Sequence, residues 1–379
     1  MTHYDVLVAG VGGVGSSALH HLARRGARVL GLDRFAPGHD RGSSHGETRI
    51  IRLTYFEHPD YVPLLRRAYE LWDELESATG KNLFHRTGIL QVGPREGEIV
   101  RGVLESASEH GLEVEDIPLE EAARRYPAFR FSEDSAALFE PTGGYLEVEE
   151  CVRAHAQEAQ RAGAEIEIGE HVLDWQPEGD GVLVRTNRRE ISTGHLVLTV
   201  GAWAPSLVQA LGIELRVQRQ PLFWFDAAPA THSEDSGFPC FFFQTENGEF
   251  YGFPHLEPHG LKVAQHGEGH PVDDPLTLDQ TVDSDEERRV TGFLERHIPG
   301  VRRDYRHHAV CMYTMSSDAH FVVGKEPTGA PISFATGLSG HGFKFTSVLG
   351  ETLADLALFG RTDAPIEFLE ATRPALQTA

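Results

Sequence analysis

Three glycines near the start of the chain have the spacing of a phosphate-binding turn. Gly10, Gly12 and Gly15 follow a short apolar run in the pattern G-x-G-x-x-G. The first permits a tight turn, the second lets the backbone approach a pyrophosphate, and the third lets a helix pack closely on the preceding strand. Asp33, eighteen residues after Gly15, could accept hydrogen bonds from a ribose and would repel a 2′-phosphate, despite the neighbouring Arg34. The pattern predicts a site for a dinucleotide without a 2′-phosphate.

A loop rich in glycine and serine follows the expected ribose contact, at residues 35–55. Backbone and hydroxyl donors from Ser43 and Ser44 could reach phosphate there. Arg49 and Arg52 lie three apart, so a helix or a tight turn would place both guanidinium groups on one face. A pair of surface arginines is the ordinary interpretation, but a position beside the dinucleotide favours a functional role.

Two lysines could place positive charge in a site. Lys262 and His266 lie four apart on an apolar run that is expected to be a strand, so they share one side of it. From this pattern alone, an edge or solvent-facing lysine is the simpler interpretation of Lys262. Lys344 follows a glycine-rich loop at the start of an expected helix over 344–358. A lysine there opposes the helix dipole, so it is expected to serve a ligand.

Two kinds of scaffold would position these residues. A strand over 6–9, a helix over about 16–25 and a strand over 28–32 form a βαβ unit around the glycines. Between about 217 and 270, aromatic alternating runs are typical of an antiparallel sheet. A strand over 195–199 runs into Gly201 and Trp203, which indicates a return to the first sheet beside a ligand. Other helices are expected over 59–80, 98–109, 118–127, 147–162 and 286–297, and other strands over 87–92, 165–173, 182–186 and from 332.

Length and composition narrow the class of protein. A chain of 379 residues is long enough for two to three domains. Its 57 acidic and 34 basic residues give a net charge of -23, which argues against nucleic acid or an anionic membrane as a partner. No apolar run approaches the roughly 18 residues of a membrane span, and no leader precedes the first strand, so a cytoplasmic protein is expected. Cys151, Cys240 and Cys311 are too few and too far apart for a disulfide framework or a zinc site, and no metal is proposed.

Four longer motifs follow one another along the chain: HGETRIIR (45–52), YGFP with GLK and a following histidine (251–266), VCMYT (310–314) and GLSGHGFKF (337–345). Taken in order, they resemble the family of monomeric sarcosine oxidase and N-methyltryptophan oxidase, within the glycine and D-amino-acid oxidase superfamily. The resemblance runs nearly from end to end. It departs at SSDAHFVVG, where Ala319 and Gly324 replace the Glu and Asp usual in the family, which bears on local packing and loop position.

The resemblance implies FAD, attached covalently by a thioether from Cys311 to the flavin 8α-methyl group. With the glycine motif and its neighbours, it gives a set of expected cofactor-binding residues. They are Gly10, Gly12, Gly13, Val14, Gly15, Asp33, Arg34, Ser43, Ser44, Arg49, Ile50, Val172, Gly201, Trp203, Cys311, Gly340, Gly342, Phe343 and Lys344.

The resemblance also implies roles around a substrate. Arg52 and Lys344 match the family residues that bind the substrate carboxylate, and charge-assisted pairs of this kind fix orientation. Lys262 matches the lysine that activates dioxygen, where a fixed cation would stabilise developing superoxide. The remaining matches are His266, Tyr251 and Tyr313 in the substrate pocket, and His45 and Arg49 on the other side of the flavin. His266 is not expected to be an obligatory base.

The implied reaction is oxidation of a secondary amino acid to an imine, which water hydrolyses, while O2 becomes H2O2. Sarcosine, N-methyltryptophan, another N-methyl amino acid and a cyclic secondary amine such as pipecolate or proline all fit the pattern. A flavin dehydrogenase with another electron acceptor is an alternative that Lys262 argues against. An NAD-dependent dehydrogenase is supported by the first thirty residues alone, and a non-enzymatic flavoprotein would need no carboxylate clamp.

The expected architecture is an α/β protein with a Rossmann-like FAD domain and a second domain on a mixed, largely antiparallel sheet. The FAD domain is expected over 1–85, 145–215 and 305–379. The substrate domain is expected over 86–144 and 216–304. The family resemblance implies a monomer whose partners are a small secondary amino acid and O2.

Overall fold

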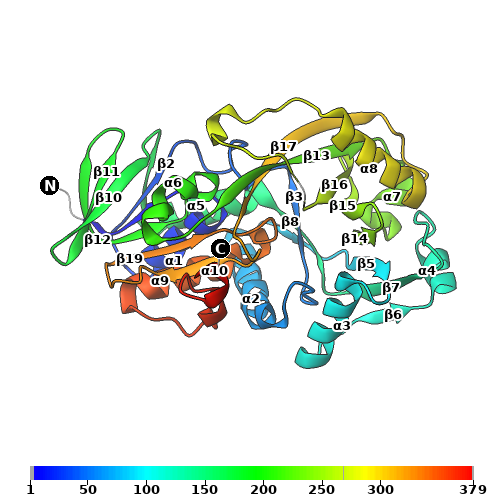
Figure 1. The fold of residues 1–379 in the computed structure, drawn as a ribbon, viewed down its shortest axis with the longest axis horizontal. Helices are drawn as coiled ribbons and strands as arrows, with labels where there is room; N and C mark the ends of the chain where they lie inside the picture. The colour runs from blue at the N-terminus through cyan, green and yellow to red at the C-terminus, as the bar shows by residue number, and fades with distance from the viewer. Residues whose placement is uncertain (1–3, 268, 378–379) are drawn as a thin grey trace.

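A mostly parallel sheet forms one half of the molecule in the computed structural model, which describes residues 4–267 and 269–377 (Figure 1). Its centre is β1 (Tyr4–Ala9), which pairs in parallel with β2 (Val29–Asp33) and β12 (Glu190–Leu198). In the same direction, β9 (Glu165–Ile168) extends the sheet beyond β2, and β19 (Ile332–Thr336) extends it beyond β12. The predicted return of the chain to the first sheet is therefore confirmed.

Antiparallel strands continue this sheet. β10 (Val172–Glu178) and β11 (Gly181–Thr186) form a hairpin, and β11 pairs with β12 in the sheet. β18 (Val322–Lys325) pairs with β19. The single strand predicted over 165–173 was wrong, because β9 and β10 are two strands with different neighbours. The two strands are separated at Gly169, whose φ of 77° lies in the left-handed region and ends the extended conformation.

Helices cover one face of the parallel strands. These are α1 (Gly13–Arg24), α2 (Val62–Thr79), α5 (Val148–Arg161) and α9 (Thr346–Phe359), which share one apolar core. The amphipathic patterns predicted all four, but α1 starts three residues earlier than expected, at Gly13. Residues 343–345 form a 3-10 turn before α9, so Lys344 precedes the α-helix. Helix α1 packs closely at the first of these starts, because a Cβ at Gly13 would lie 2.8 Å from the Cγ2 of Thr346.

The second sheet carries the aromatic runs. It contains β13 (Arg216–Phe225), β14 (Cys240–Thr245), β15 (Gly248–Leu256), β16 (Gly260–His266) and β17 (Tyr305–Met315). The strand order is β17-β13-β16-β15-β14, and these neighbours are antiparallel. The predicted antiparallel sheet is confirmed. β17 begins at Tyr305, where the FAD domain was predicted to resume. The division into domains stays a prediction.

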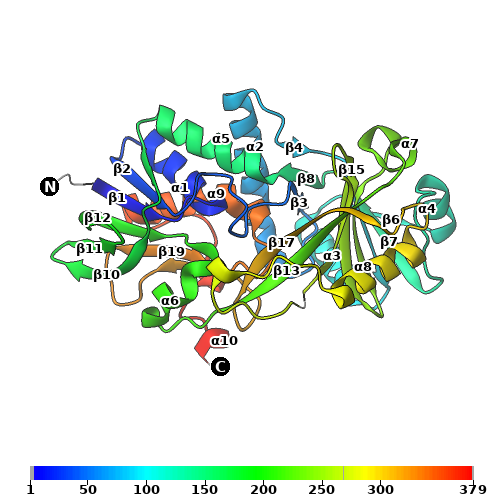
Figure 2. The same cartoon turned by 90° about the horizontal axis from the view of Figure 1, so that it is seen from above.

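Three more strands complete the second sheet, in the order β5 (Ile89–Pro94), β7 (Ser135–Glu140) and β6 (Glu115–Ile117). β5 pairs with β14 in parallel, which makes the sheet mixed as expected. Three helices complete this half of the molecule: α3 (Glu98–His110), α4 (Leu119–Arg125) and α8 (Ser284–His297). Figures 1 and 2 show β13 and β17 running from the middle of the molecule into this second half.

A small sheet between the halves holds the arginine-bearing segment. β3 (Thr48–Ile51) and β4 (Phe84–His85) both pair with β8 (Gly144–Glu147). The helix or tight turn considered for Arg49 and Arg52 is not formed, because β3 is extended and Arg52 directly follows its last residue. Short helices complete the fold: α6 (Ala204–Val208), α7 (Pro229–His232) and α10 (Pro374–Gln377).

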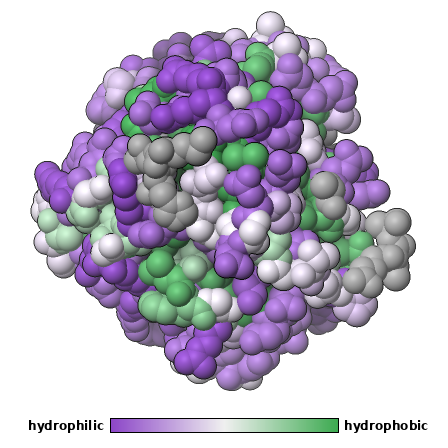
Figure 3. All heavy atoms as spheres, turned by 90° about the vertical axis from the view of Figure 1, so that its left-hand side faces the viewer, coloured by the Kyte–Doolittle hydropathy of each residue, from purple (hydrophilic) through white to green (hydrophobic). Residues whose placement is uncertain are grey.

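Figure 3 shows one face of the molecule, on which hydrophobic residues form separate patches among hydrophilic ones. Exposed Ile168 and Leu173 flank the β9–β10 break, and exposed Phe359 ends α9. Among residues 4–267 and 269–377, no helix is long and apolar enough to span a membrane.

Candidate active site

A long cleft begins where β1 and β2 end and runs toward β17 and the 337–343 loop. Most of the predicted cofactor residues line it, although they come from six separate stretches of the chain. They are Gly10, Gly12, Gly13, Val14, Asp33, Arg34, Ser43, Ser44, Arg49, Val172, Gly201, Trp203, Gly340, Gly342 and Phe343. The fold therefore brings together the glycine turn, the serine loop and the second glycine loop along one groove.

The glycine turn has the shape that a pyrophosphate requires. A Cβ at Gly15 would lie 1.8 Å from the carbonyl oxygen of Gly10, and a Cβ at Gly10 would lie 2.5 Å from that of Thr199. These contacts leave no room for a side chain. A Cβ at Gly12 would meet nothing closer than the Oγ of Ser44, at 3.7 Å, so the backbone there is open to a ligand. The N-terminus of α1 therefore faces the cleft with uncrowded backbone at Gly12. The N–H of Gly13 donates to the Oγ of Ser44 at 3.2 Å.

Asp33 is held in place for a ribose. Its carboxylate accepts hydrogen bonds from the backbone N–H groups of Val11 at 2.7 Å and Phe35 at 2.9 Å. Two carboxylate oxygens offer about four acceptor sites, so acceptor capacity remains on the cleft side. The residues of this end of the cleft fit an adenosine diphosphate moiety.

A second, smaller chamber adjoins the far end of the cleft. The two cavities share four wall residues, Arg49, Tyr313, Gly340 and Phe343. The other residues that line the chamber are Ile50, Arg52, Glu57, Phe242, Tyr251, His266, His341 and Lys344. All the residues predicted to bind substrate therefore lie in this chamber, beside the dinucleotide groove.

Arg52 is buried in the chamber and paired with a carboxylate. Its Nη2 donates to both oxygens of Glu57, at 2.9 and 2.7 Å, and its Nη1 donates to the carbonyl of Thr54 at 2.9 Å. Its guanidinium also lies over the rings of Tyr55 and Phe56. Burial opposes ionisation of Glu57, but Arg52 outweighs it and lowers the pKa of Glu57 to about 2. Glu57 is therefore a carboxylate at any working pH.

Lys344 has donors left for a ligand. Its ammonium donates to the carbonyl of His341 at 2.7 Å and lies over the ring of Tyr55. Within the described ranges no other hydrogen bond of this ammonium is found, so two of its three N–H groups remain. Burial, with a further contribution from Arg52, lowers the pKa of Lys344 to about 7. A bound anion would restore its charge.

Cys311 lies against Arg49 near the junction of the two cavities. The Nη2 of Arg49 lies 3.1 Å from its Sγ, and the same nitrogen donates to the carbonyl of Ser43. Burial raises the pKa of this thiol, but Arg49 and then His45 outweigh it and lower the pKa to about 7. Thiolates are the nucleophilic form of cysteine, so Cys311 is set up for reaction. Cys151 and Cys240, by contrast, are buried and have raised pKa values.

Lys262 is fully enclosed, which corrects its interpretation as a solvent-facing residue. It is 2 % exposed, and its ammonium donates to the carbonyls of Gly46 at 2.5 Å and Thr48 at 2.8 Å. The rings of Trp224 and Phe253 lie on it at 5.4 and 4.7 Å. Burial and the nearby Arg49 lower its pKa well below the usual value. Carbonyls and ring faces together favour the cationic form in a site that otherwise disfavours it.

His266 forms the aromatic side of the chamber with two tyrosines. Its Nδ1 lies 3.3 Å from the hydroxyl of Tyr313, and its ring packs edge-on to Tyr251 and Phe242. Burial lowers the pKa of His266 to about 4, so its imidazole is neutral at pH 7. The pKa values of both tyrosines are raised, chiefly by burial.

The sequence predictions missed Glu57 and His341. Glu57 lies in the YFEHP loop, where nothing in its spacing marks it, and its relation to Arg52 depends on how that loop folds. His341 lies inside the glycine-rich GHGFK segment, so the motif itself could have indicated it. Gly15, Cys311, His45 and Lys262 line neither cavity directly.

Comparisons with known proteins agree with this geometry. The model of the family FAD dependent oxidoreductase matches residues 5–356. The chain is 41% identical to a monomeric sarcosine oxidase of Streptomyces avermitilis, over 99% of both chains. It is 34% identical to an N-methyl-L-tryptophan oxidase of Salmonella arizonae, over 94% of this chain and 95% of that one. The crystal structure of NikD, an amino acid oxidase essential for nikkomycin biosynthesis, superposes with a TM-score of 0.85 at 28% identity and covers 98% of both chains.

Proposed function

The chain belongs to the FAD-dependent oxidoreductase family, and from that premise we propose that it is an oxidase of secondary amino acids, with sarcosine and other N-methyl amino acids as the favoured class. The products would be the demethylated amino acid, formaldehyde and H2O2. One observation carries the proposal: Arg52 and Lys344 line one aromatic chamber that shares its wall with the dinucleotide groove. Two cations in a small enclosed chamber suit a carboxylate next to a redox cofactor.

FAD would lie along the groove. Bound there, it supplies a two-electron acceptor that can be reoxidised by O2. The glycine turn and the start of α1 would hold its pyrophosphate, and Asp33 would hold the adenosine ribose. Ser43, Ser44 and the 340–343 loop would hold the remainder.

The substrate carboxylate would bind Arg52 and Lys344. Because Glu57 already occupies the Nη2 of Arg52, an incoming carboxylate must displace Glu57 or share the guanidinium with it. Lys344 contributes its two unused N–H groups. Together these contacts would orient the substrate with its amine toward the shared wall of Tyr313 and Gly340.

The chamber walls would keep the substrate amine in its reactive neutral form. Phe242, Tyr251 and Tyr313 enclose the chamber, and the loss of water around an enclosed amine disfavours its ammonium form by desolvation. His266 is neutral and could take a hydrogen bond from the amine without competing for its proton. Removal of two electrons and two protons from the C–N bond gives an imine, which water converts to amine and aldehyde. The two electrons and two protons reduce one O2 to H2O2.

Lys262 would supply positive charge for the reaction with O2. Its ammonium is fixed by Gly46 and Thr48 in an enclosed position, so charge that develops on dioxygen would be stabilised without reorganisation. This residue favours an oxidase over a dehydrogenase that uses another acceptor.

Cys311 would carry the flavin covalently. The thiolate favoured by Arg49 and His45 would form a carbon–sulfur bond to the 8α-methyl carbon, with overall loss of two hydrogens that O2 takes up as H2O2. The monomeric name of the Streptomyces relative supports a monomer for this chain as well.

Steady-state kinetics of three variants tests the proposal. Arg52→Lys and Lys344→Met should each raise KM for sarcosine, by roughly tenfold or more if each charge-assisted contact contributes about 1.5–3 kcal/mol. Lys262→Met should leave anaerobic bleaching of the flavin intact and slow its reaction with O2. The control is Lys325→Met, an exposed lysine on β18. The proposal is wrong if no secondary amino acid bleaches the flavin of the wild-type protein.

A further inference from the structure

His341 is fixed at both ring nitrogens, and its backbone holds Lys344. Its Nε2 lies 3.0 Å from the carbonyl of Ala319 and its Nδ1 contacts the hydroxyl of Tyr55. A carbonyl can only accept, so Nε2 carries the proton and Nδ1 accepts from Tyr55. Burial lowers the pKa of His341 to about 3, so this neutral form persists. The residue whose ring is held in this way also offers its backbone carbonyl to the Lys344 ammonium, at 2.7 Å.

The Ala319 carbonyl is placed by a tight turn over residues 316–320. Ala319 has a φ of 60°, in the left-handed region that residues with a side chain rarely adopt. Asp318 stabilises the turn by accepting from the backbone N–H of His320 at 3.1 Å. The hydroxyl of Ser316 lies 2.6 Å from the carbonyl of His320 and closes the turn. Because the backbone is unfavourable by itself, these contacts keep Ala319 aimed at His341.

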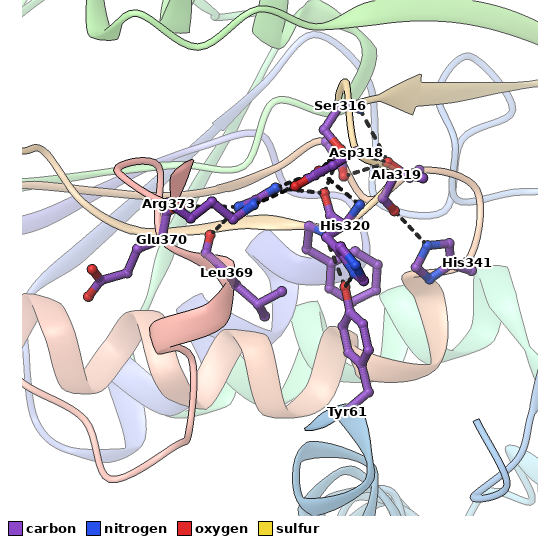
Figure 4. Close-up of polar contacts among 12 residues, drawn as sticks. Tyr61, Ser316, Asp318, Ala319, His320, His341, Leu369, Glu370 and Arg373 are labelled. Atoms are coloured by element: carbon purple, nitrogen blue, oxygen red, sulfur yellow. Dashed lines mark hydrogen bonds and ion pairs between the residues drawn. The ribbon is translucent and has the colours of Figure 1, made fainter. Parts of the chain in front are cut away.

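Arg373 near the end of the chain locks that turn from the opposite side. Its Nε and Nη2 donate to the two oxygens of Asp318 at 2.8 and 2.9 Å. The Nη1 of the same residue donates to the carbonyl of Leu369 at 2.9 Å, which fixes the guanidinium itself. The two paired side chains are only 9% and 15% exposed. Figure 4 shows Arg373 reaching Asp318 on one side of the turn while His341 contacts Ala319 on the other.

We infer that the Arg373–Asp318 pair is a positioning device for the substrate carboxylate site, acting through the 316–320 turn and His341 on Lys344 and Tyr55. The inference rests on the proposed function, in which Lys344 binds the carboxylate. It assigns a role to Arg373 near the end of the chain and to the turn that contains Ala319. Neither paired residue lines the chamber.

Arg373 acts on the turn as well as on the C-terminal segment. It donates to the carbonyls of Leu369 and Glu370 in that segment. Its ion pair is with Asp318, in the turn whose Ala319 carbonyl contacts His341. Three hydrogen bonds connect the pair to Lys344. Asp318 accepts from the backbone N–H of His320, the residue next to Ala319 in the turn. The carbonyl of Ala319 contacts the Nε2 of His341, and the carbonyl of His341 accepts from Lys344. A shift of the turn would therefore move the Lys344 ammonium while leaving Arg52 paired with Glu57.

The test compares two small probes on the flavin-loaded protein. Acetate carries only the carboxylate and dimethylamine carries only the secondary amine, and both can be titrated through the flavin absorbance. The variants are Arg373→Ala, Asp318→Asn and the double variant. The matched control is Arg95→Ala, which removes another two-bond Arg–Asp pair, with Asp116 on the outer strand β6. Lys344→Met is measured in parallel.

We expect Arg373→Ala to weaken acetate binding about tenfold, the middle of the range for coupling through a packed network. Dimethylamine binding and the rate of reaction with O2 should stay within about twofold, and the double variant should match the single ones. Should Arg373→Ala not fold, Asp318→Asn decides the question. If Lys344→Met weakens acetate binding and the Arg373 and Asp318 variants do not, this inference alone is overturned. If Lys344→Met has no effect, the proposed carboxylate site fails and the inference fails with it.

Discussion

Replacing Glu57 by glutamine should tighten the binding of carboxylate ligands. Glu57 is an ionised carboxylate in the chamber, and both of its oxygens contact the Nη2 of Arg52. It therefore competes with any substrate carboxylate for the same donor. Glutamine keeps the size and one acceptor oxygen but loses the charge.

The magnitude follows from the number of hydrogen bonds exchanged. The Nη2 of Arg52 contacts both oxygens of Glu57, and glutamine offers only one oxygen. A bond to a charged group contributes about 1.5–3 kcal/mol, so a ligand that displaces one bond fewer should bind about tenfold tighter or more. The free protein should pay for this with lower stability, because Arg52 is buried and would lose its counter-charge.

The assay is titration of the flavin-loaded protein with acetate at pH 6, where Lys344 is mostly protonated. The negative charge of Glu57 raises the pKa of Lys344, so in Glu57→Gln the affinity should also fall off at a lower pH than in wild type. Glu351→Gln is the control, since Glu351 forms a similar two-bond pair with Arg67 away from the chamber. Unchanged or weaker acetate binding in Glu57→Gln, with wild-type behaviour of the control, would refute competition for Arg52.

Three further predictions concern Cys311 and Lys344. Acid precipitation of the wild-type protein should leave the yellow colour in the pellet, and Cys311→Ser should release it. The control Cys240→Ser changes a buried cysteine with a raised pKa and should not release it. Colour that leaves the wild-type protein with the supernatant would contradict the covalent link. Acetate affinity should decrease as pH rises through about 7. The pKa of Lys344 is lowered to about 7, and only the protonated lysine binds an anion well. The decrease should be absent in Lys344→Met. The lowered pKa of Lys344 also makes stability depend on pH. Between about pH 7 and the ordinary lysine pKa of 10.5, the unfolded chain binds a proton that the folded protein does not, so the free energy of unfolding should increase as pH rises.

The parts of the fold that the sequence predicted are those with strong local causes. The glycine turn was readable because backbone crowding at Gly10 and Gly15 admits no other residue. The long helices α2 and α5 followed from apolar residues at helical spacing. The aromatic strands followed from alternation and turn residues.

The parts that could not be predicted depend on contacts between distant segments. Lys262 looked like an edge residue, because alternation gives the side of a strand but not what packs on that side. It is buried by the carbonyls around Glu47, more than two hundred residues earlier. Glu57 belongs to the site because the YFEHP loop folds back so that its carboxylate contacts Arg52. The break at Gly169 was missed because apolar residues occur on both sides of the glycine, at Ile166 and Ile168 before it and at Val172 and Leu173 after it, so the run was interpreted as one strand.

Oxygen uptake by the purified protein tests the central claim most directly. We would supply sarcosine, N-methyltryptophan, proline and pipecolate, each beside its methyl ester, and measure O2 consumed and H2O2 formed. The account predicts one H2O2 per O2 with at least one free acid, formaldehyde in equal amount when the substrate is N-methylated, and little or no reaction with the esters. Equal rates for acids and esters would contradict a carboxylate clamp at Arg52 and Lys344. Bleaching of the flavin by a free acid without O2 consumption would contradict the oxidase and indicate a dehydrogenase.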